Sequence, residues 1–326
     1  TEDYQFGTNP CSEIILRNRE FCNLSEVVVR TSDTRDTLIR KVRLATILGT
    51  FQSTLTDFKY IRNIWKKNTE EERLLGVSLT GIMDSDLLSG TSAHLGMNIG
   101  ATLEALRDVA VETNAEMADA LLIPRSTAIT CVKPSGTVSQ LVDSASGIHA
   151  RHNPHYIRTV RGDNKDPLTQ FLISEGIPAE PDVMKPDSTT VFSFPMASPR
   201  GAVTRTLMTA LEQLELWLMY QRYWCEHKPS VTISVKENEW MDVGAWVYKH
   251  FDEVSGISFL PFSDHTYAQA PYQDCTEDEY ENMLTKMPVS VNWSRLQEFE
   301  KEDTTSGGRE LACTAGVCEV VDLNAA

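Results

Sequence analysis

The sequence predicts an α/β fold assembled from βαβ units around a parallel sheet. Five short apolar stretches have the pattern of buried strands, and stretches with helical periodicity separate them. The 326 residues, 41% of them hydrophobic, are enough to bury a large core in one or two domains. Such units place their functional loops at strand ends. The predicted strands are residues 75–79, 127–132, 190–194, 231–235 and 257–260.

Helical patterns lie before and between these strands. Residues 35–65 carry apolar side chains at three- and four-residue intervals after the cap-forming segment Thr31-Ser32-Asp33, which predicts one or two helices. Thr69 and Glu72 have the spacing of a capping box, which predicts a short helix beginning there. Further helices are predicted at residues 101–122, 204–226 and 240–251.

The charge of the chain excludes one class of partner. A net charge of −16 argues against wrapping nucleic acid, because that role needs basic surfaces that replace phosphate counterions. A bound nucleotide would therefore be a small ligand. The sequence has no apolar run long enough to cross a bilayer and no signal-like start, so we expect a soluble cytoplasmic protein.

The seven cysteines favour redox use over a structural role. Their spacing is not that of a secreted disulfide framework. No CxxC or HxxxH pair offers a metal site. Cys131, Cys225 and Cys275 fall in strand-like, helix-like and loop contexts, and we interpret them as packing residues.

The segment Asn9-Pro10-Cys11-Ser12-Glu13 combines a carboxamide, a thiol and a carboxylate within five residues. Asn9, Cys11 and Glu13 occupy alternate positions, so in an extended loop their side chains would point to one side and surround a small substrate. The alternative is a buried thiol after a turn-forming Asn-Pro.

The string NPCSEIILRNREFCNL resembles the thiyl-radical loop of ribonucleotide reductases, with Cys22 eleven positions after Cys11, as in the adenosylcobalamin-dependent (class II) enzymes. The strings GVSLTGIMD, KPSGTVSQL and FLPF…HTYAQAPY agree, as does the terminal pair Cys313 and Cys318, and the whole looks most like the single-chain branch. The resemblance implies the second five-stranded half of a ten-stranded α/β barrel. Residues 1–300 would form this catalytic half-barrel, with the radical-cysteine finger loop at about residues 5–25, and residues 301–326 a flexible redox-shuttle tail.

The resemblance also implies catalytic roles in the finger loop. Cys11 would carry the thiyl radical that abstracts the ribose 3′ hydrogen, Glu13 would accept the 3′-hydroxyl proton, and Asn9 would hydrogen-bond the sugar hydroxyls. Cys22 would be one member of the reducing pair, and its alternative is a merely buried thiol.

The tail cysteines would complete the redox chemistry. Cys313 and Cys318 follow a Gly-rich linker and are five residues apart, so they could re-reduce the internal disulfide by thiol exchange. An incidental thiol pair is the alternative.

The Pro-Ser-Gly segment predicts a phosphate site. It follows a predicted strand and opens a helix, so free backbone N–H groups would converge on an anion there, with Lys133 as an electrostatic aid. Strand, turn and helix occur in many proteins, and the Walker spacing is absent. The predicted substrate-binding residues are Leu24, Pro134, Ser135, Gly136, Thr137, Val138 and Ser139.

Adenosylcobalamin is the predicted cofactor. Adjacent tyrosines, which a subunit-fed enzyme would need, are absent from the sequence, and so is the C-terminal glycyl-radical motif. The Asp-x-His-x-x-Gly box is also absent, so no histidine is predicted to bind the cobalt. His265, Tyr267 and Pro271 are predicted to line the cofactor, and an ordinary aromatic loop is the alternative.

The predicted function is reduction of ribonucleoside triphosphates, or diphosphates, with a dithiol as reductant. The alternatives are a fragment of a radical-subunit-dependent (class I) reductase and a non-catalytic nucleotide-binding relic or partner. Because the chain begins at Thr1, just before the loop, an N-terminal polypeptide is expected to carry the other half-barrel, the effector site and the second redox cysteine. A thioredoxin-like protein is the expected reductant.

Overall fold

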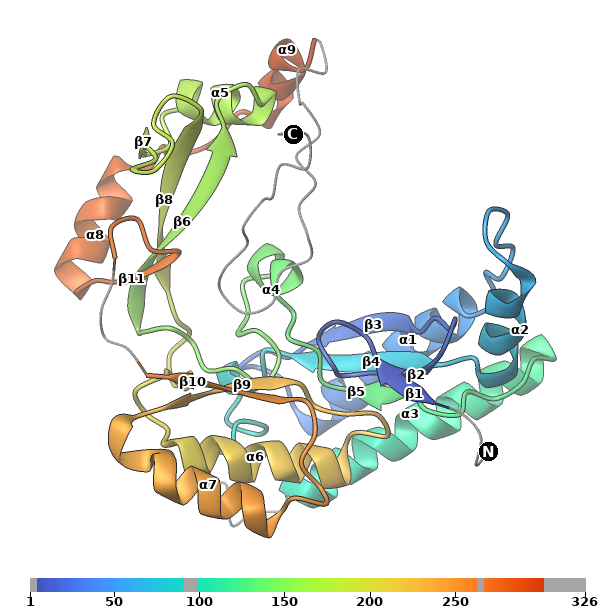
Figure 1. Cartoon of the computed structure of the whole chain (residues 1–326). Helices are drawn as coiled ribbons and strands as arrows, with labels where there is room; N and C mark the ends of the chain where they lie inside the picture. The colour runs from blue at the N-terminus through green and yellow to red at the C-terminus, as the bar shows by residue number, and fades with distance from the viewer. Residues whose placement is uncertain (1–4, 91–98, 263–266, 302–326) are drawn as a thin grey trace. The chain divides into compact units, whose positions relative to one another are not determined.

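The computed structural model describes residues 5–90, 99–262 and 267–301. They form two compact units, and the chain passes through each of them twice (Figure 1). The first consists of Thr1–Arg151 and Pro199–Phe262, and the second of His152–Ser198 and Ser263–Ala326. The second unit therefore takes its residues from two separate parts of the chain.

Parallel strands form the centre of the first unit. Strands β3 (Asn23–Val28), β4 (Leu75–Thr80) and β5 (Thr130–Cys131) pair in parallel in the order β3-β4-β5. Strands β9 (Val231–Val235) and β10 (Ile257–Pro261) form a second parallel pair.

A parallel bridge joins these two groups of strands. Val132, directly after β5, bridges Pro229: its N–H donates to the Lys228 carbonyl at 3.1 Å, and its carbonyl accepts from the Ser230 N–H at 2.9 Å. Five parallel strands therefore follow one another in the order β3-β4-β5-β9-β10. This array confirms the parallel α/β character that the sequence predicted.

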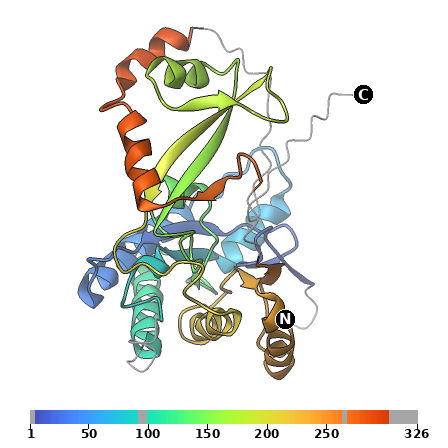
Figure 2. The ribbon, with the colours of Figure 1, turned by 90° about the vertical axis from the view of Figure 1, so that its left-hand side faces the viewer.

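Helices cover one face of this array. In both ribbon views α3, α6 and α7 lie on one side of the strands, and the short helix α4 lies on the other (Figures 1 and 2). The predicted apolar faces are buried in part: Leu38 on α1 and Leu103 on α3 are fully inaccessible, whereas Leu48 and Leu55 are 64% and 73% exposed. The helices are α1 (Arg35–Gln52), α2 (Asn63–Glu72), α3 (Ile99–Leu121), α4 (Thr137–Leu141), α6 (Ala210–Tyr223), α7 (Trp240–Lys249) and the 3₁₀ turns η1 (Ile82–Asp84) and η2 (Glu237–Glu239).

Helix α6 carries the largest buried side chains of the core. Trp217, Tyr220 and Trp224 are fully buried, and each also satisfies its polar atom. Trp217 Nε1 donates to the Pro229 carbonyl at 2.6 Å, and Trp224 Nε1 donates to the Cys131 carbonyl at 2.7 Å. These bonds fix α6 against the junction between β5 and β9.

The predicted capping box at Thr69 and Glu72 is wrong. These residues form the last turn of α2, which runs from Asn63 to Glu72. Arg73, directly after it, caps the helix in the left-handed conformation with φ 49°. The Thr-x-x-Glu pattern describes four residues only, and it occurs inside helices as well as at their start. Thr34 provides the observed cap of α1, where its side chain accepts from the Thr37 N–H at 3.3 Å.

An antiparallel sheet forms the second unit. Its strand order is β11-β6-β8-β7, and β6 pairs with β8 over nine residue pairs, from His155 opposite Ala197 to Asp163 opposite Thr189. Its elements are β6 (His155–Asp163), α5 (Pro167–Ser174), β7 (Ala179–Pro181), β8 (Thr189–Ala197), β11 (Tyr272–Asp274), α8 (Glu277–Lys286), η3 (Trp293–Arg295) and α9 (Leu296–Phe299).

This sheet corrects one predicted strand. Residues 190–194 do form a strand, but they belong to β8 in the antiparallel sheet and not to the parallel array. The fifth parallel strand is β3, whose mixed sequence Asn-Leu-Ser-Glu-Val-Val did not predict a buried strand. Strand propensity is a local property, whereas the choice of pairing partner depends on residues far along the chain.

Among the described residues, no helix combines the length and the apolar character that crossing a lipid bilayer requires.

Candidate active site

The predicted finger loop is the tip of a β-hairpin. Strands β1 (Phe6–Thr8) and β2 (Ile15–Arg17) pair antiparallel, with Thr8 opposite Ile15. Between them the Asn9 carbonyl accepts from the Ser12 N–H at 3.0 Å, and Asn9 Oδ1 accepts from the Ile14 N–H at 3.0 Å. Ser12 adopts a left-handed conformation with φ 64°. The loop is thus a turn that Asn9 stabilises from within.

This turn corrects the predicted geometry of the loop. We expected Asn9, Cys11 and Glu13 to alternate along an extended chain, but the left-handed residue between Cys11 and Glu13 breaks that alternation. Cys11 is half-buried, whereas Glu13 is completely buried. The side-chain oxygen of Asn9 is already engaged with the loop backbone.

Glu13 forms a buried ion pair with Lys133. Lys133 Nζ lies 2.8 Å from Glu13 Oε1, while the side chain of Lys133 is 31% exposed. Among the described residues, the other carboxylate oxygen, Oε2, has no hydrogen-bond partner although it is buried. The Glu13 backbone is also fixed, because its carbonyl accepts from the Lys228 N–H at 3.0 Å. One oxygen of this carboxylate is therefore buried with its hydrogen-bonding capacity unused by the described residues.

The charges of this site perturb the ionisation of its members. Burial alone would lower the pKa of Lys133, but the hydrogen bond and charge of Glu13, aided by the neighbouring Cys11 and Cys131, raise it above its usual value. Burial, together with the negative charge of Glu13, raises the pKa of the Cys22 thiol to about 11, against the opposing charge of Lys133.

The predicted catalytic thiols therefore lie in one electrostatic neighbourhood. Cys11 is at the hairpin tip and Cys22 directly precedes β3, and both are free thiols. Both interact electrostatically with Lys133. Cys131, which the sequence assigned to packing, is fully buried.

The predicted turn before a short helix is present at Pro134–Ser139. Helix α4 begins after Gly136, whose φ of 47° favours glycine. The Gly136 N–H donates to Ser146 Oγ at 3.2 Å, and Ser139 Oγ donates to the Gly136 carbonyl at 2.7 Å. Ser135 and Ser139 are buried, while the turn exposes Gly136, Thr137 and Val138.

Leu24 lies beside the loop for a steric reason. It is opposite Gly76 on β4, where an added Cβ would stand 2.4 Å from Leu24 Cδ2 and 3.1 Å from Ile14 Cδ1. The missing side chain of Gly76 therefore makes the space into which Leu24 and the finger-loop residue Ile14 pack.

A buried ion pair holds the segment that follows α4. Arg151 Nε lies 2.8 Å from Asp84 Oδ1, and Arg151 Nη2 lies 2.9 Å from Oδ2. The same Oδ2 accepts from the Ala145 N–H at 2.9 Å, and Thr80 Oγ1 donates to the Ala145 carbonyl at 3.0 Å. The sequence did not single out Asp84 or Arg151, because they lie 67 residues apart and each is an ordinary charged residue locally.

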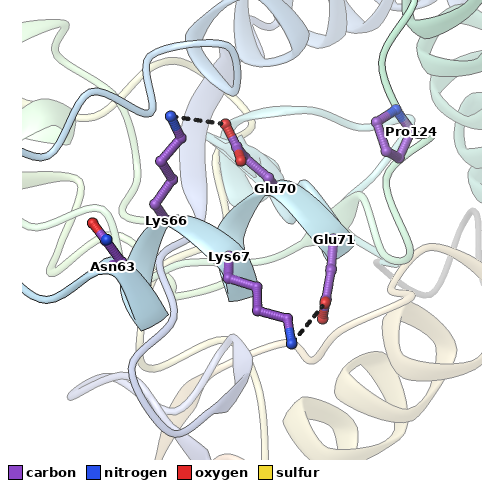
Figure 3. Close-up of a pocket in the computed structure, with 6 residues that line it drawn as sticks. All are labelled: Asn63, Lys66, Lys67, Glu70, Glu71 and Pro124. Atoms are coloured by element: carbon purple, nitrogen blue, oxygen red, sulfur yellow. Dashed lines mark ion pairs between the residues drawn. The ribbon is translucent and has the colours of Figure 1, made fainter.

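Two cavities among the described residues are lined by residues other than the predicted catalytic ones. The larger, of about 350 Å³, lies on the surface of α2, where Lys66 pairs with Glu70 and Lys67 with Glu71 (Figure 3). The smaller, of about 100 Å³, is lined by His149 and Arg205, among others.

The residues predicted to line the cofactor lie apart from the finger loop in the sequence. Tyr267 is exposed, and the Pro271 carbonyl accepts from the Thr159 N–H at 3.1 Å within the second unit. His265 lies outside the described residues. Cys313 and Cys318 also lie outside them.

Comparison with curated proteins finds relatives over nearly the whole chain. An adenosylcobalamin-dependent ribonucleoside-triphosphate reductase from Euglena gracilis is 29% identical over 317 residues, which cover 96% of this chain and 42% of the relative. A probable enzyme of the same name from Dictyostelium discoideum is 27% identical, covering 98% of this chain and 41% of the relative. The enzyme from Lactobacillus helveticus is 26% identical, covering 96% and 45%. The chain spans less than half the length of these relatives.

Solved structures agree on the fold. The crystal structure of a B12-dependent (class II) ribonucleotide reductase superposes with a TM-score of 0.76 at 22% identity, covering 92% of this chain and 44% of that one. The class Id ribonucleotide reductase α subunit of Actinobacillus ureae gives a TM-score of 0.50 at 13% identity. No family model matches the sequence. The resemblance to class II reductases that the motifs indicated is confirmed, and the mixed α/β fold is similar to theirs.

Proposed function

We propose that this chain is the C-terminal catalytic half of an adenosylcobalamin-dependent ribonucleotide reductase that acts on ribonucleoside triphosphates. The observation that carries the proposal is the finger loop. It holds a free Cys11 two residues before a buried Glu13, whose Oε2 has no partner among the described residues. The positive charge of Lys133 acts on both Cys11 and Cys22. The names of the curated relatives supply the reaction and the substrate class.

The barrel is part of the proposal. Five parallel strands in the order β3-β4-β5-β9-β10 supply the number expected for half of a ten-stranded barrel. Closure would need five more strands. We assign them to an N-terminal half that also carries the effector site and the second redox cysteine.

The loop residues divide the chemistry between them. A sulfur radical at Cys11 takes the 3′ hydrogen atom of the ribose, which forms an S–H bond and leaves a carbon radical. Glu13 accepts the 3′-hydroxyl proton at Oε2, and the 2′-hydroxyl leaves as water once a thiol has protonated it. Cys11 finally returns a hydrogen atom to C3′. Asn9 keeps the loop in shape and directs its amide nitrogen toward the sugar hydroxyls.

A pair of thiols supplies the two electrons. Cys22 and a cysteine of the N-terminal half become a disulfide as the ribonucleotide becomes a deoxyribonucleotide and water. Cys313 and Cys318 would then reduce that disulfide by thiol exchange within a redox-shuttle tail at residues 301–326, and a thioredoxin-like protein would reduce the tail.

The phosphates are assigned to the turn before α4. Thr137 and Val138 are exposed there, and the glycine at position 136 leaves the backbone open, with nothing within 4 Å of the position a Cβ would take. The Gly136 and Val138 N–H groups already donate, to Ser146 Oγ at 3.2 Å and to the Ser135 carbonyl at 3.1 Å, so we assign phosphate contact to the exposed Thr137 at the start of α4. Leu24 and Pro134 would border the sugar.

The residues of the loop fit the proposed cofactor in one respect. Cys11 is a free, half-buried thiol at the tip of a hairpin, so its sulfur can be reached by a bound group. When bound, adenosylcobalamin supplies a radical by homolysis of its cobalt–carbon bond. Tyr267, Pro271 and His265 stay predictions from the sequence for its lining.

The test is exchange of cofactor hydrogen. The chain is mixed with a candidate N-terminal half and adenosylcobalamin tritiated at the 5′ carbon, and tritium release into water is measured. We expect release from the wild type and none from Cys11→Ala. Release that survives in Cys11→Ala would refute the role of Cys11. No release from the wild type, with activity that depends instead on a separate radical subunit, would assign the chain to class I. No activity with any partner would favour a nucleotide-binding relic.

A further inference from the structure

Lys133 connects two parts of the candidate site that are far apart in the sequence. It directly precedes the Pro134–Ser139 turn, and its ammonium reaches Glu13 in the finger loop, 120 residues away. We had expected Lys133 to assist phosphate binding, but its Nζ bonds Glu13 Oε1 at 2.8 Å. This contact indicates a second role for the lysine.

We propose that Lys133 is a positioning residue for Glu13, binding one carboxylate oxygen so that the group stays ionised and Oε2 keeps its hydrogen-bonding capacity for the substrate hydroxyl. The inference rests on the proposed function for the identity of that hydroxyl. The contact itself is independent of it.

The position of the lysine is fixed by its own backbone. The Lys133 N–H donates to Ser78 Oγ on β4 at 2.9 Å. Its carbonyl is packed against Gly147, where an added Cβ would stand only 2.5 Å from that oxygen and φ is 55°. The segment that carries the predicted phosphate turn thereby also sets the position of the ammonium.

The burial of Glu13 makes this counter-charge necessary. Its side chain has no exposed surface, and a carboxylate buried without an opposite charge takes up a proton. A general base must be ionised to accept a proton from the substrate. The ammonium of Lys133 balances the negative charge of Glu13 and contacts only its Oε1. Oε2 is buried without a partner among the described residues.

The other charged groups around Lys133 do not replace Glu13 as its partner. Burial raises the pKa of Glu26 on β3, while the Ser135 hydroxyl and the charge of Lys133 oppose that rise. Cys11, Cys22 and Cys131 are the remaining titratable groups that its charge reaches. The buried His227 also interacts with Glu13, but burial lowers the pKa of that imidazole, which disfavours its charged form. Glu13 is the carboxylate in hydrogen-bond contact with it.

The first experiment measures the ionisation of Glu13 in the chain by itself. Carboxyl ¹³C resonances of labelled glutamate are followed from pH 5 to 9, and Glu13→Gln identifies the signal of Glu13. We compare the wild type with Lys133→Met, which removes the charge, and with Lys133→Arg, which keeps it. Lys67→Met is the matched control, because Lys67 belongs to an exposed lysine–glutamate pair at 3.8 Å.

We expect Glu13 to be ionised at pH 7 in the wild type, in Lys133→Arg and in Lys67→Met, and protonated in Lys133→Met. An ionised Glu13 in Lys133→Met would overturn the proposal. Should Lys133→Met fold poorly, its urea midpoint is compared with that of Glu13→Gln/Lys133→Met. If the double variant regains at least half of the decrease in urea midpoint that Lys133→Met causes, the result supports the ion pair between Lys133 and Glu13. No recovery contradicts the ion pair.

The second experiment separates positioning from phosphate binding in the assembled enzyme. A positioning role predicts that Lys133→Met lowers kcat by about 100-fold, with KM for the nucleotide changed by less than about threefold, and that the lost activity returns as pH rises. Lys133→Arg should retain at least about a tenth of kcat. A rise in KM at unchanged kcat would instead assign Lys133 to the phosphates. An inactive wild-type assembly would refute the proposed function, while the Glu13 titration would still decide the ion pair.

Discussion

Removing Asp84 should destabilise the first unit strongly, because it would leave Arg151 buried without its main counter-charge. The two side chains are 3% and 4% exposed and share two contacts, at 2.8 and 2.9 Å. Asp84 also accepts the Ala145 N–H at 2.9 Å. Asp143 contacts another nitrogen of Arg151 at 3.0 Å but is 60% exposed, so it compensates only in part.

The expected cost of Asp84→Ala follows from these contacts. Removing one partner of a buried pair costs about 3–5 kcal/mol, and the orphaned Ala145 N–H adds to the loss. Replacing both charges, in Asp84→Leu/Arg151→Met, should restore most of that stability, since no unpaired charge remains. The exposed pair of Asp119 and Arg125 is the control: its two contacts at 2.7 and 3.1 Å are as short, yet both side chains are about 60% exposed. Asp119→Ala should therefore change the free energy of unfolding much less than Asp84→Ala does, because solvent screens the exposed pair.

Urea unfolding followed by tryptophan fluorescence measures these differences. Trp217 and Trp224 are fully buried in the same unit as Asp84, so their emission reports its unfolding. The reasoning is refuted if Asp84→Ala and Asp119→Ala change the free energy of unfolding by the same amount. It is also refuted if the double variant is less stable than Asp84→Ala.

Two further predictions concern ionisation near the finger loop. Burial raises the pKa of Glu20 to about 7, and the negative charge of Glu72 adds to this rise. The hydrogen bond from the Arg17 N–H acts in the opposite direction. The folded state therefore binds this proton more tightly than the unfolded state, and stability should fall as pH rises from about 4.5 to about 7. Glu20→Gln should remove that slope in urea titrations between pH 5 and 8, and an unchanged slope would contradict the assignment. With a pKa of about 11, Cys22 should react with iodoacetamide at a rate that still rises about tenfold per pH unit between pH 7 and 10. Peptide mass spectrometry measures this rate, and a plateau below pH 9 would contradict the raised pKa.

Several elements were predictable because their signals are local. The apolar run at 231–235 became β9, and the periodic stretch at 101–122 became α3 within two residues at each end. The hairpin tip also lies where the motif placed it. Periodicity and short motifs depend only on neighbouring residues, so one sequence suffices to read them.

The two wrong strand assignments depend on distant residues. The polar β3 is a strand because it pairs with β4 along its whole length, from Asn23 opposite Leu75 to Val28 opposite Thr80. Residues 190–194 have a strand-forming sequence, but their partner β6 directed them to an antiparallel sheet. Neither partner can be read from the strand itself.

The sequence by itself determined the α/β class and most helices, and it singled out the candidate residues of the finger loop, because each of these signals lies in a short window. Only the tertiary structure decided that the loop is a turn, that Glu13 is buried, and that Lys133 is its counter-charge. An ion pair forms where the chain brings two charges together out of water, and that proximity depends on the packing of strands and loops separated by more than a hundred residues.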